Sequence, residues 1–76
     1  MRDRRAREMI LGMLSEGEMN GRQLRSEMTD HGIRKGRVRF YALMARMEDS
    51  GEVVGRWKAL PLSGCRERRY QIPKGE

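Results

Sequence analysis

The sequence predicts one α+β domain, in which three helices are followed by a two-stranded β-hairpin. Apolar residues recur at helical spacing in three segments of the first 50 residues. Two later segments alternate between apolar and polar residues, as strands do. Glycine, proline, asparagine and aspartate separate these segments and indicate turns. With 76 residues and no repeats, we expect a single domain spanning residues 1–76.

The first helix is expected over residues 3–16. Its apolar residues share one stripe of the helix, at offsets of three, four, seven and eight: Ala6, Met9, Ile10, Met13 and Leu14. Asp3 suits the positive end of the helix dipole, and Gly17 is expected to end the helix.

The second helix is expected to begin after Asn20. Asn20 is a good N-cap, and Gln23 three residues later can complete a capping box. Leu24 and Met28 then face inward together. We expect this helix to end near Thr29, with residues 29–32 forming a turn.

The third helix is expected from about residue 35 to residue 50. Its core face carries Phe40, Leu43, Met44 and Met47. Gly51 is expected directly after the helix, in the left-handed conformation.

Two strands are expected within residues 52–72, joined by the turn sequence Leu-Pro-Leu-Ser-Gly and ended by Pro73. In the first strand, Val53, Gly55 and Trp57 share one face. We interpret Trp57 as a cover for the small core beside Val53, with stacking on a nucleobase as the alternative. The order of elements predicts a helix-turn-helix followed by a basic hairpin, or wing, which is the winged-helix architecture.

The net charge of +6 and the sequence pI near 10.4 point to a polyanionic partner. Nucleic acid is the first choice and an anionic membrane surface the second, while arginines that serve only solubility are the remaining alternative. No apolar run is long enough to span a bilayer, and the N-terminus does not read as a secretory signal. We expect a cytoplasmic, nucleoid-associated protein without a membrane partner.

No catalytic constellation is evident, so we expect a binding protein and not an enzyme. His31 has no second histidine or cysteine at ligand spacing, which argues against a metal site. Cys65 is the single cysteine and has no base at a suggestive spacing. No glycine-rich loop of the nucleotide-binding type is present, and no cofactor is expected.

The outer side of the third helix suits the major groove of DNA. A ridge of small residues, Val38, Ala42 and Ala45, lies opposite the core face. Such a ridge lets a helix approach base edges, while cations at its margins reach the phosphates. We place Arg39 and Arg46 on one margin of this ridge, and Arg37 and Tyr41 on the other.

The approach to the third helix is basic and carries no acid, although the helix dipole favours acids there. A recognition helix usually meets bases with its N-terminal residues, so this polarity favours DNA, with a solvated arginine face as the alternative. Further DNA contacts are expected from the second helix and from the hairpin, whose cations are opposed only by Glu67. The cations concerned are Arg34, Lys35, Arg37 and Arg39 in the approach, Arg22 and Arg25 in the second helix, and Arg56, Lys58, Arg66, Arg68 and Arg69 in the hairpin.

Three stretches together resemble PadR-like winged-helix transcriptional regulators: ILGMLSEGEMNGRQLRSEM, GRVRFYALMARMEDSGEVVGRW and RRYQIPKG. The matching positions are Ile10, Leu11, Gly12, Leu14, Gly21, Leu24, Tyr41, Met44, Arg46, Met47, Glu48, Gly51, Val53, Arg69, Tyr70, Ile72 and Gly75. The resemblance implies a sequence-specific repressor or activator, with Tyr41 and its neighbours near double-stranded DNA. Members usually continue into helices that form a dimer, whereas this sequence ends at Glu76. We expect a homodimer on paired half-sites, and the sequence does not identify its interface.

Two other functions remain open. The same fold serves architectural, excision or replication accessory proteins of the phage or plasmid type, which bind DNA without regulating transcription. It also serves as a module that binds RNA or an acidic protein, because fold alone does not settle function.

Overall fold

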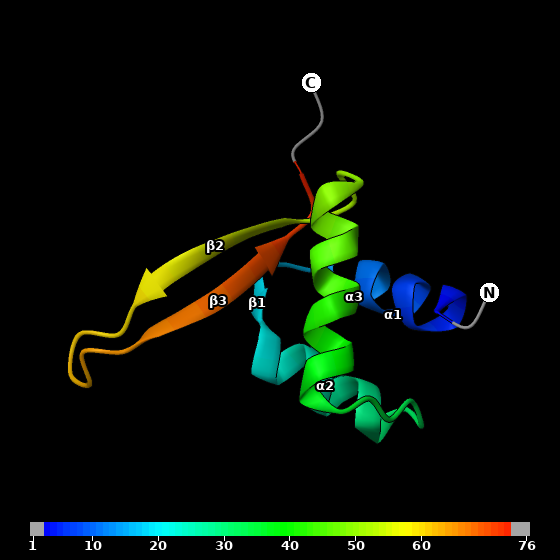
Figure 1. Cartoon of the computed structure of the whole chain (residues 1–76), viewed down its shortest axis with the longest axis horizontal. Coiled ribbons are helices and arrows are strands. Elements are labelled where there is room, and N and C mark those ends of the chain that lie inside the picture. Colours follow the sequence, from blue (N-terminus) through cyan, green and yellow to red (C-terminus); the bar gives the residue numbers. More distant parts are fainter. Residues whose placement is uncertain (1–2, 74–76) are drawn as a thin grey trace.

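A computed structural model describes residues 3–73. The elements follow in the order α1 (Arg4–Leu14), β1 (Met19–Asn20), α2 (Gly21–Asp30), α3 (Arg37–Asp49), β2 (Val54–Ala59) and β3 (Arg66–Gln71). Three helices gather at one end of the molecule, and the β2–β3 hairpin projects from them (Figure 1). The predicted α+β class, three helices followed by a hairpin, is confirmed.

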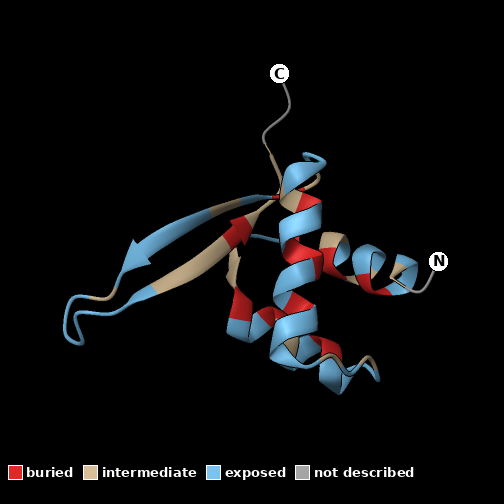
Figure 2. Ribbon diagram, in the orientation of Figure 1, coloured by how far each residue is buried: buried red, intermediate tan, exposed pale blue. Residues whose placement is uncertain are grey.

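The core lies between the three helices and the base of the hairpin. Tyr70 and Val53 close it from the hairpin side. Most residues of the helical stripes predicted from the sequence are buried (Figure 2), whereas Met9 and Met13 of α1 are only partly buried. The buried apolar residues are Ala6, Ile10, Leu14, Leu24, Met28, Phe40, Leu43, Met44, Met47, Val53 and Tyr70.

Two helices are shorter than predicted. Helix α1 begins one residue after Asp3 and ends at Leu14, where the Ser15 hydroxyl donates a 2.6 Å hydrogen bond to the Gly12 carbonyl. Helix α3 begins only at Arg37, because Gly36 is extended (φ −66°, ψ 166°). Arg34 and Lys35 therefore precede the helix. Gly51 has a φ of 84°, the left-handed conformation predicted for it.

The capping box predicted at the start of α2 is present. The Gln23 backbone N–H donates to the Asn20 side-chain oxygen at 2.8 Å, and the Asn20 backbone N–H donates to the Gln23 side chain at 3.1 Å. The helix continues to Asp30, one residue beyond Thr29, and the chain turns at His31 and Gly32. Gly32 permits this turn with a φ of 89°.

The sheet has three strands, where the sequence predicted two. Strand β1 pairs antiparallel with β3, with Met19 opposite Tyr70 and Asn20 opposite Arg69. Strand β3 thus lies between β1 and β2. The predicted hairpin of β2 and β3 is present. Strand β1 is an additional strand that the sequence did not predict, since two residues are too few to show alternation.

The register gives the hairpin two different faces, because residues that pair across antiparallel strands point to the same side. Gly55 pairs with Tyr70, Trp57 with Arg68 and Ala59 with Arg66. We call this the front face, because Arg68 bonds to Glu48 of α3. The back face holds the pairs Arg56–Arg69 and Lys58–Glu67.

Candidate nucleic-acid interface

Helix α3 presents the predicted ridge to the surface. Val38 is 84% exposed, and Ala42 and Ala45 are also exposed. The opposite side of the helix is fixed by Phe40 and Met44, which are fully buried. The exposed side of α3 is visible in Figure 2, uncovered by any other described element. A narrow, apolar ridge is therefore free for a partner.

Arg37 and Arg39 flank the ridge at the start of α3. Both are exposed, and within residues 3–73 neither has a carboxylate partner. Arg34, in the preceding loop, is likewise exposed and has no such partner there. These three guanidinium groups keep their positive charge uncompensated beside the ridge.

The carboxylate of Asp3 neutralises the charge of two other residues that were predicted to contact DNA. It accepts a 2.9 Å hydrogen bond from the Lys35 ammonium and a 2.5 Å hydrogen bond from Arg46. These interactions, with Lys35 first, hold the pKa of Asp3 below its usual value. The Lys35 side chain is only 17% exposed. Residues 34–39 carry no acid of their own, but the fold brings Asp3, the residue before α1, to Lys35.

Tyr41 connects α3 to the start of α2. It is 39% exposed, and its ring meets the Phe40 ring edge-on with centroids 5.0 Å apart. Its hydroxyl lies over Gly21, the first residue of α2. Arg22, the next residue, is exposed and unpaired within residues 3–73, whereas Arg25 is half-buried. Tyr41 and Arg22 thus come together at a helix N-terminus, where backbone N–H groups favour anions.

The back face of the hairpin is largely neutralised. Glu18, just before β1, accepts a 2.8 Å hydrogen bond from Arg56 and lies 3.2 Å from Arg69. Arg69 also donates to Glu67 at 2.5 Å, which raises the pKa of Arg69, and the Arg56 hydrogen bond lowers that of Glu18. The prediction that Glu67 alone opposes the hairpin cations was wrong, since Glu18 and Glu48 also oppose them.

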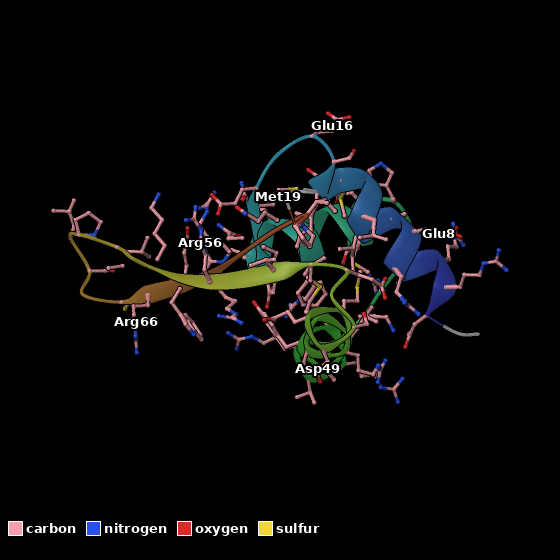
Figure 3. The ribbon with its side chains drawn as sticks, turned by 90° about the horizontal axis from the view of Figure 1, so that it is seen from above. Glu8, Glu16, Met19, Asp49, Arg56 and Arg66 are labelled. Atoms are coloured by element: carbon pink, nitrogen blue, oxygen red, sulfur yellow. The ribbon has the colours of Figure 1, made fainter. Side chains whose placement is uncertain are left out.

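The front face carries an exposed aromatic residue between two cations. Trp57 is 60% exposed, so its interpretation as a core residue was wrong. The guanidinium carbons of Arg68 and Arg66 lie 5.1 Å and 5.7 Å from its ring centroid, within cation–π range. Arg68 also donates to Glu48 at 2.5 Å. Arg66 has no carboxylate partner in the described chain, and Figure 3 shows it on the same side as Asp49 of α3.

The structure thus divides the predicted DNA contacts into two groups. Within residues 3–73, the unpaired and exposed cations are Arg22, Arg34, Arg37, Arg39, Lys58 and Arg66, and Arg25 is unpaired there but half-buried. The cations held by carboxylates are Lys35, Arg46, Arg56, Arg68 and Arg69. Contact with DNA stays a prediction for all of them. For Trp57, the sequence analysis gave stacking on a nucleobase only as the alternative; its exposure and the strand register that pairs it with Arg68 favour that alternative.

Other kinds of site find little support in residues 3–73. No group of three or more potential metal ligands occurs there. None of the described helices is both long and apolar enough to cross a membrane. Cys65 is a free, exposed cysteine beside the turn of the hairpin. Gly75, one position of the family resemblance, lies outside the described residues.

The fold is similar to that of three solved structures. Bacillus subtilis PadR in complex with operator DNA superposes with a TM-score of 0.77 and 19% identity, covering 92% of this chain and 40% of PadR. Pex from Synechococcus sp. gives a TM-score of 0.73 and 23% identity, covering 90% and 62%. The circadian clock associated protein Pex from Anabaena gives 0.72 and 31%, covering 90% and 61%.

This chain therefore spans 40 to 62% of the length of those three proteins. No protein-family model and no curated protein sequence matches it. The helices, the hairpin and their order agree with the resemblance found in the sequence, and the solved structures share that arrangement. The chain has the winged-helix fold and shares it with PadR and the two Pex proteins.

Proposed function

We propose that this domain is a sequence-specific, double-stranded DNA-binding transcriptional regulator of the cytoplasm, acting by binding and not by catalysis. Helix α3 enters the major groove with Val38, Ala42 and Ala45 toward the base edges. Arg37 and Arg39 stand at the N-terminal half of the helix, where recognition helices contact bases. The observation that carries this proposal is the exposed ridge of α3 beside cations that no carboxylate within residues 3–73 neutralises. PadR, which shares the fold, is solved with operator DNA.

The flanking contacts follow from the same charge pattern. Tyr41, Arg22 and the first N–H groups of α2 hold one phosphate. The hairpin lies along the neighbouring backbone with its front face, because Arg66 is uncompensated there and Trp57 is exposed. The back-face arginines, Arg56 and Arg69, contribute less because Glu18 binds both.

Selection of bound duplexes from a random pool, followed by titration of the selected duplex, tests the proposal. Affinity should fall with salt, with a slope of about −0.9 per phosphate contacted. Arg39→Ala should cost about 1–3 kcal/mol and relax the base preference at one position. Arg4→Ala removes the same charge from the exposed start of α1 and serves as the matched control. Equal losses in both variants would contradict a base contact by Arg39.

The hairpin is tested by a second matched pair. Arg66→Ala should weaken binding to all duplexes alike, since phosphate contacts carry no sequence information. Arg56→Ala, on the back face of the same hairpin, should weaken it less. The opposite order would place the back face against DNA.

The same measurements separate the alternatives. Equal affinity for every duplex, unaltered in preference by variants at Arg37 and Arg39, identifies an architectural or accessory DNA-binding protein. Absence of duplex binding at low salt identifies a module for RNA or an acidic protein.

A further inference from the structure

The outer turn of the hairpin, residues 60–65, exposes an apolar side chain that no described residue covers. Leu62 is fully exposed, more than any other large apolar residue of the described chain, including Trp57 at 60%. Pro61 beside it is also exposed and has no backbone N–H. The turn lies at the end of the hairpin that is far from the helices (Figure 1). An apolar tip of this kind gains free energy only when a partner buries it.

Hydrogen bonds hold this turn in a defined shape. The Leu60 N–H donates to the Cys65 carbonyl at 2.8 Å, and the Gly64 N–H donates to the Leu60 carbonyl at 3.2 Å. The Cys65 N–H also donates to the Ser63 hydroxyl at 3.2 Å. Gly64 has a φ of 72°, which a residue with a side chain rarely adopts. The turn therefore presents Leu62 without further ordering, which lowers the cost of inserting it into a partner.

The tip is flanked by cations and carries no acid. Residues 57–66 contain Lys58 and Arg66 and neither aspartate nor glutamate. Both cations are exposed and unpaired within residues 3–73, Lys58 on the back face of the hairpin and Arg66 on the front face. An apolar tip with a cation on each side matches a narrow groove whose floor is stacked bases and whose two walls are phosphates.

The hairpin is long enough to bring this tip to the minor groove of DNA. Its two strands have six residues each, which extend about 20 Å at ~3.3 Å per residue. The major groove is about 12 Å wide, so a hairpin that starts beside α3 passes over one phosphate backbone and ends at the next minor groove. That groove is only about 6 Å wide. The strands of a ribbon alone lie about 4.8 Å apart, so the tip enters fully only if the groove opens.

We propose that Leu62 is a wedge that enters the minor groove beside the α3 site, inserts between two stacked base pairs and bends the duplex. Separating one base step widens the minor groove, and proteins that insert leucine or proline in this way bend DNA by roughly 20–90°. Lys58 and Arg66 hold the phosphates on the two walls of the opened groove. The wedge rests on the proposed function, because α3 must first place the hairpin on the duplex.

The wedge adds a sequence preference at a position that α3 does not contact. Pyrimidine–purine steps, such as TA and CA, unstack most easily. The tip reaches a step about half a helical turn, roughly five base pairs, from the bases that α3 reads. The selected duplexes should therefore favour a TA or CA step at that distance, because of its flexibility and not because of hydrogen bonds.

Two probes in the selected duplex test the wedge in solution. 2-Aminopurine at the predicted step should brighten when the wild-type chain binds, because this base fluoresces more strongly when it is unstacked. Dyes at the two ends of the duplex should show the bend as increased energy transfer. Leu62→Ala should remove both signals and weaken binding roughly tenfold, while the base preference of α3 stays. Val54→Ala truncates an exposed apolar residue on the back face of the same hairpin and should change neither signal.

Two further substitutions separate a wedge from a simple contact with the backbone. Leu62→Met keeps an apolar side chain of similar volume and should keep both signals. Leu62→Lys should remove the unstacking and the bend, even where the added charge preserves the affinity. Because Leu62 is fully exposed, each variant should unfold at the same urea concentration as the wild type. A bend of wild-type size with Leu62→Lys, or wild-type complexes without unstacking, would overturn the wedge and leave the proposed function intact.

Vesicles of phosphatidylserine and phosphatidylcholine test whether the apolar tip serves a membrane surface. Leu62→Ala should leave any electrostatic binding of the chain to these vesicles unchanged. Vesicle binding that Leu62→Ala abolishes, together with an unchanged DNA bend, would contradict the wedge. Absence of duplex binding by the wild-type chain would overturn the proposed function and the wedge together.

Discussion

The phenol of Tyr41 occupies the space that a side chain at residue 21 would need. A Cβ built on Gly21 would stand 2.5 Å from the Tyr41 hydroxyl oxygen, and 2.9 Å and 3.0 Å from two ring carbons. Gly21 is buried at the start of α2, and Tyr41 lies on α3. The close approach of these two helices therefore depends on a residue without a side chain.

Gly21→Ala should destabilise the domain by about 1–3 kcal/mol, because the added methyl group overpacks the contact with Tyr41. Urea unfolding measures the effect. The double variant Gly21→Ala/Tyr41→Ala should recover most of the loss that Gly21→Ala causes, since the clashing ring is removed. Gly12→Ala is the matched control, because a Cβ there meets nothing, and it should be neutral or stabilising. Equal destabilisation by both alanines would contradict the Tyr41 contact.

Trp57→Ala should change the free energy of unfolding by less than about 1 kcal/mol, because the side chain is largely exposed and packs on arginines. Phe40→Ala, which removes a fully buried ring, should cost about 3–5 kcal/mol in the same experiment. If DNA binds the front face, Trp57→Ala should nevertheless weaken duplex binding. A loss of stability as large as that of Phe40→Ala would indicate that Trp57 is buried in the core.

Acid should destabilise the domain through Asp3, Glu18 and Glu52. Hydrogen bonds from Lys35, Arg56 and Arg7, respectively, are the leading causes that lower the pKa of these carboxyl groups from usual values of 3.8, 4.5 and 4.5. A lowered folded-state pKa contributes stability above the usual value, and that contribution is lost as the pH falls through the folded value. The free energy of unfolding should therefore decrease as the pH falls below about 5.

Asp3→Asn isolates one of these groups. It should lower stability near neutral pH, where Asp3 is charged, and flatten the decline in acid, where wild-type Asp3 is itself protonated. Thermal unfolding of both proteins across the acid range checks this. Parallel curves for the two proteins would show that the Asp3 interactions contribute no pH dependence.

Tyr70 should ionise at unusually high pH, because its burial raises its pKa to about 12 from the usual 10.0. The neutral phenol is the form that the fold favours. Stability from this group is present below pH 10 and is lost as the pH rises from 10 toward 12. Tyr41→Phe leaves Tyr70 as the only tyrosine, so its phenolate absorbance can be followed alone. Ionisation near pH 10 in folded protein would contradict the burial.

The sequence predicted well those features that repeat along the chain or depend on near neighbours. The stripes of α1 and α3, the capping box of Asn20 and Gln23, and the left-handed Gly51 are of this kind. Each of these features depends only on residues that are a few positions apart in the sequence. The exposed ridge of α3 followed in the same way, because the burial of Phe40 and Met44 fixes the opposite side.

The errors concern contacts between residues distant in the sequence. Asp3 reaches Lys35 and Arg46, and Glu18 reaches Arg56 and Arg69, so counting charges along one segment overestimated its basic character. Trp57 was assigned to the core because it alternates with Val53, but the hairpin extends beyond the helices at that point. Alternation identifies the face of a strand, whereas tertiary structure decides whether anything lies beneath it.

Asn20 fastens the hairpin to the start of α2. Its side-chain oxygen caps the helix, its side-chain amide donates to Glu67 at 3.2 Å, and it stands opposite Arg69 in the sheet. Asn20 therefore ties strand β3 to the start of α2, while the turn between β2 and β3 extends away from the helices (Figure 1). A partner that displaces that turn should therefore also shift Asn20 and, through it, the first residues of α2.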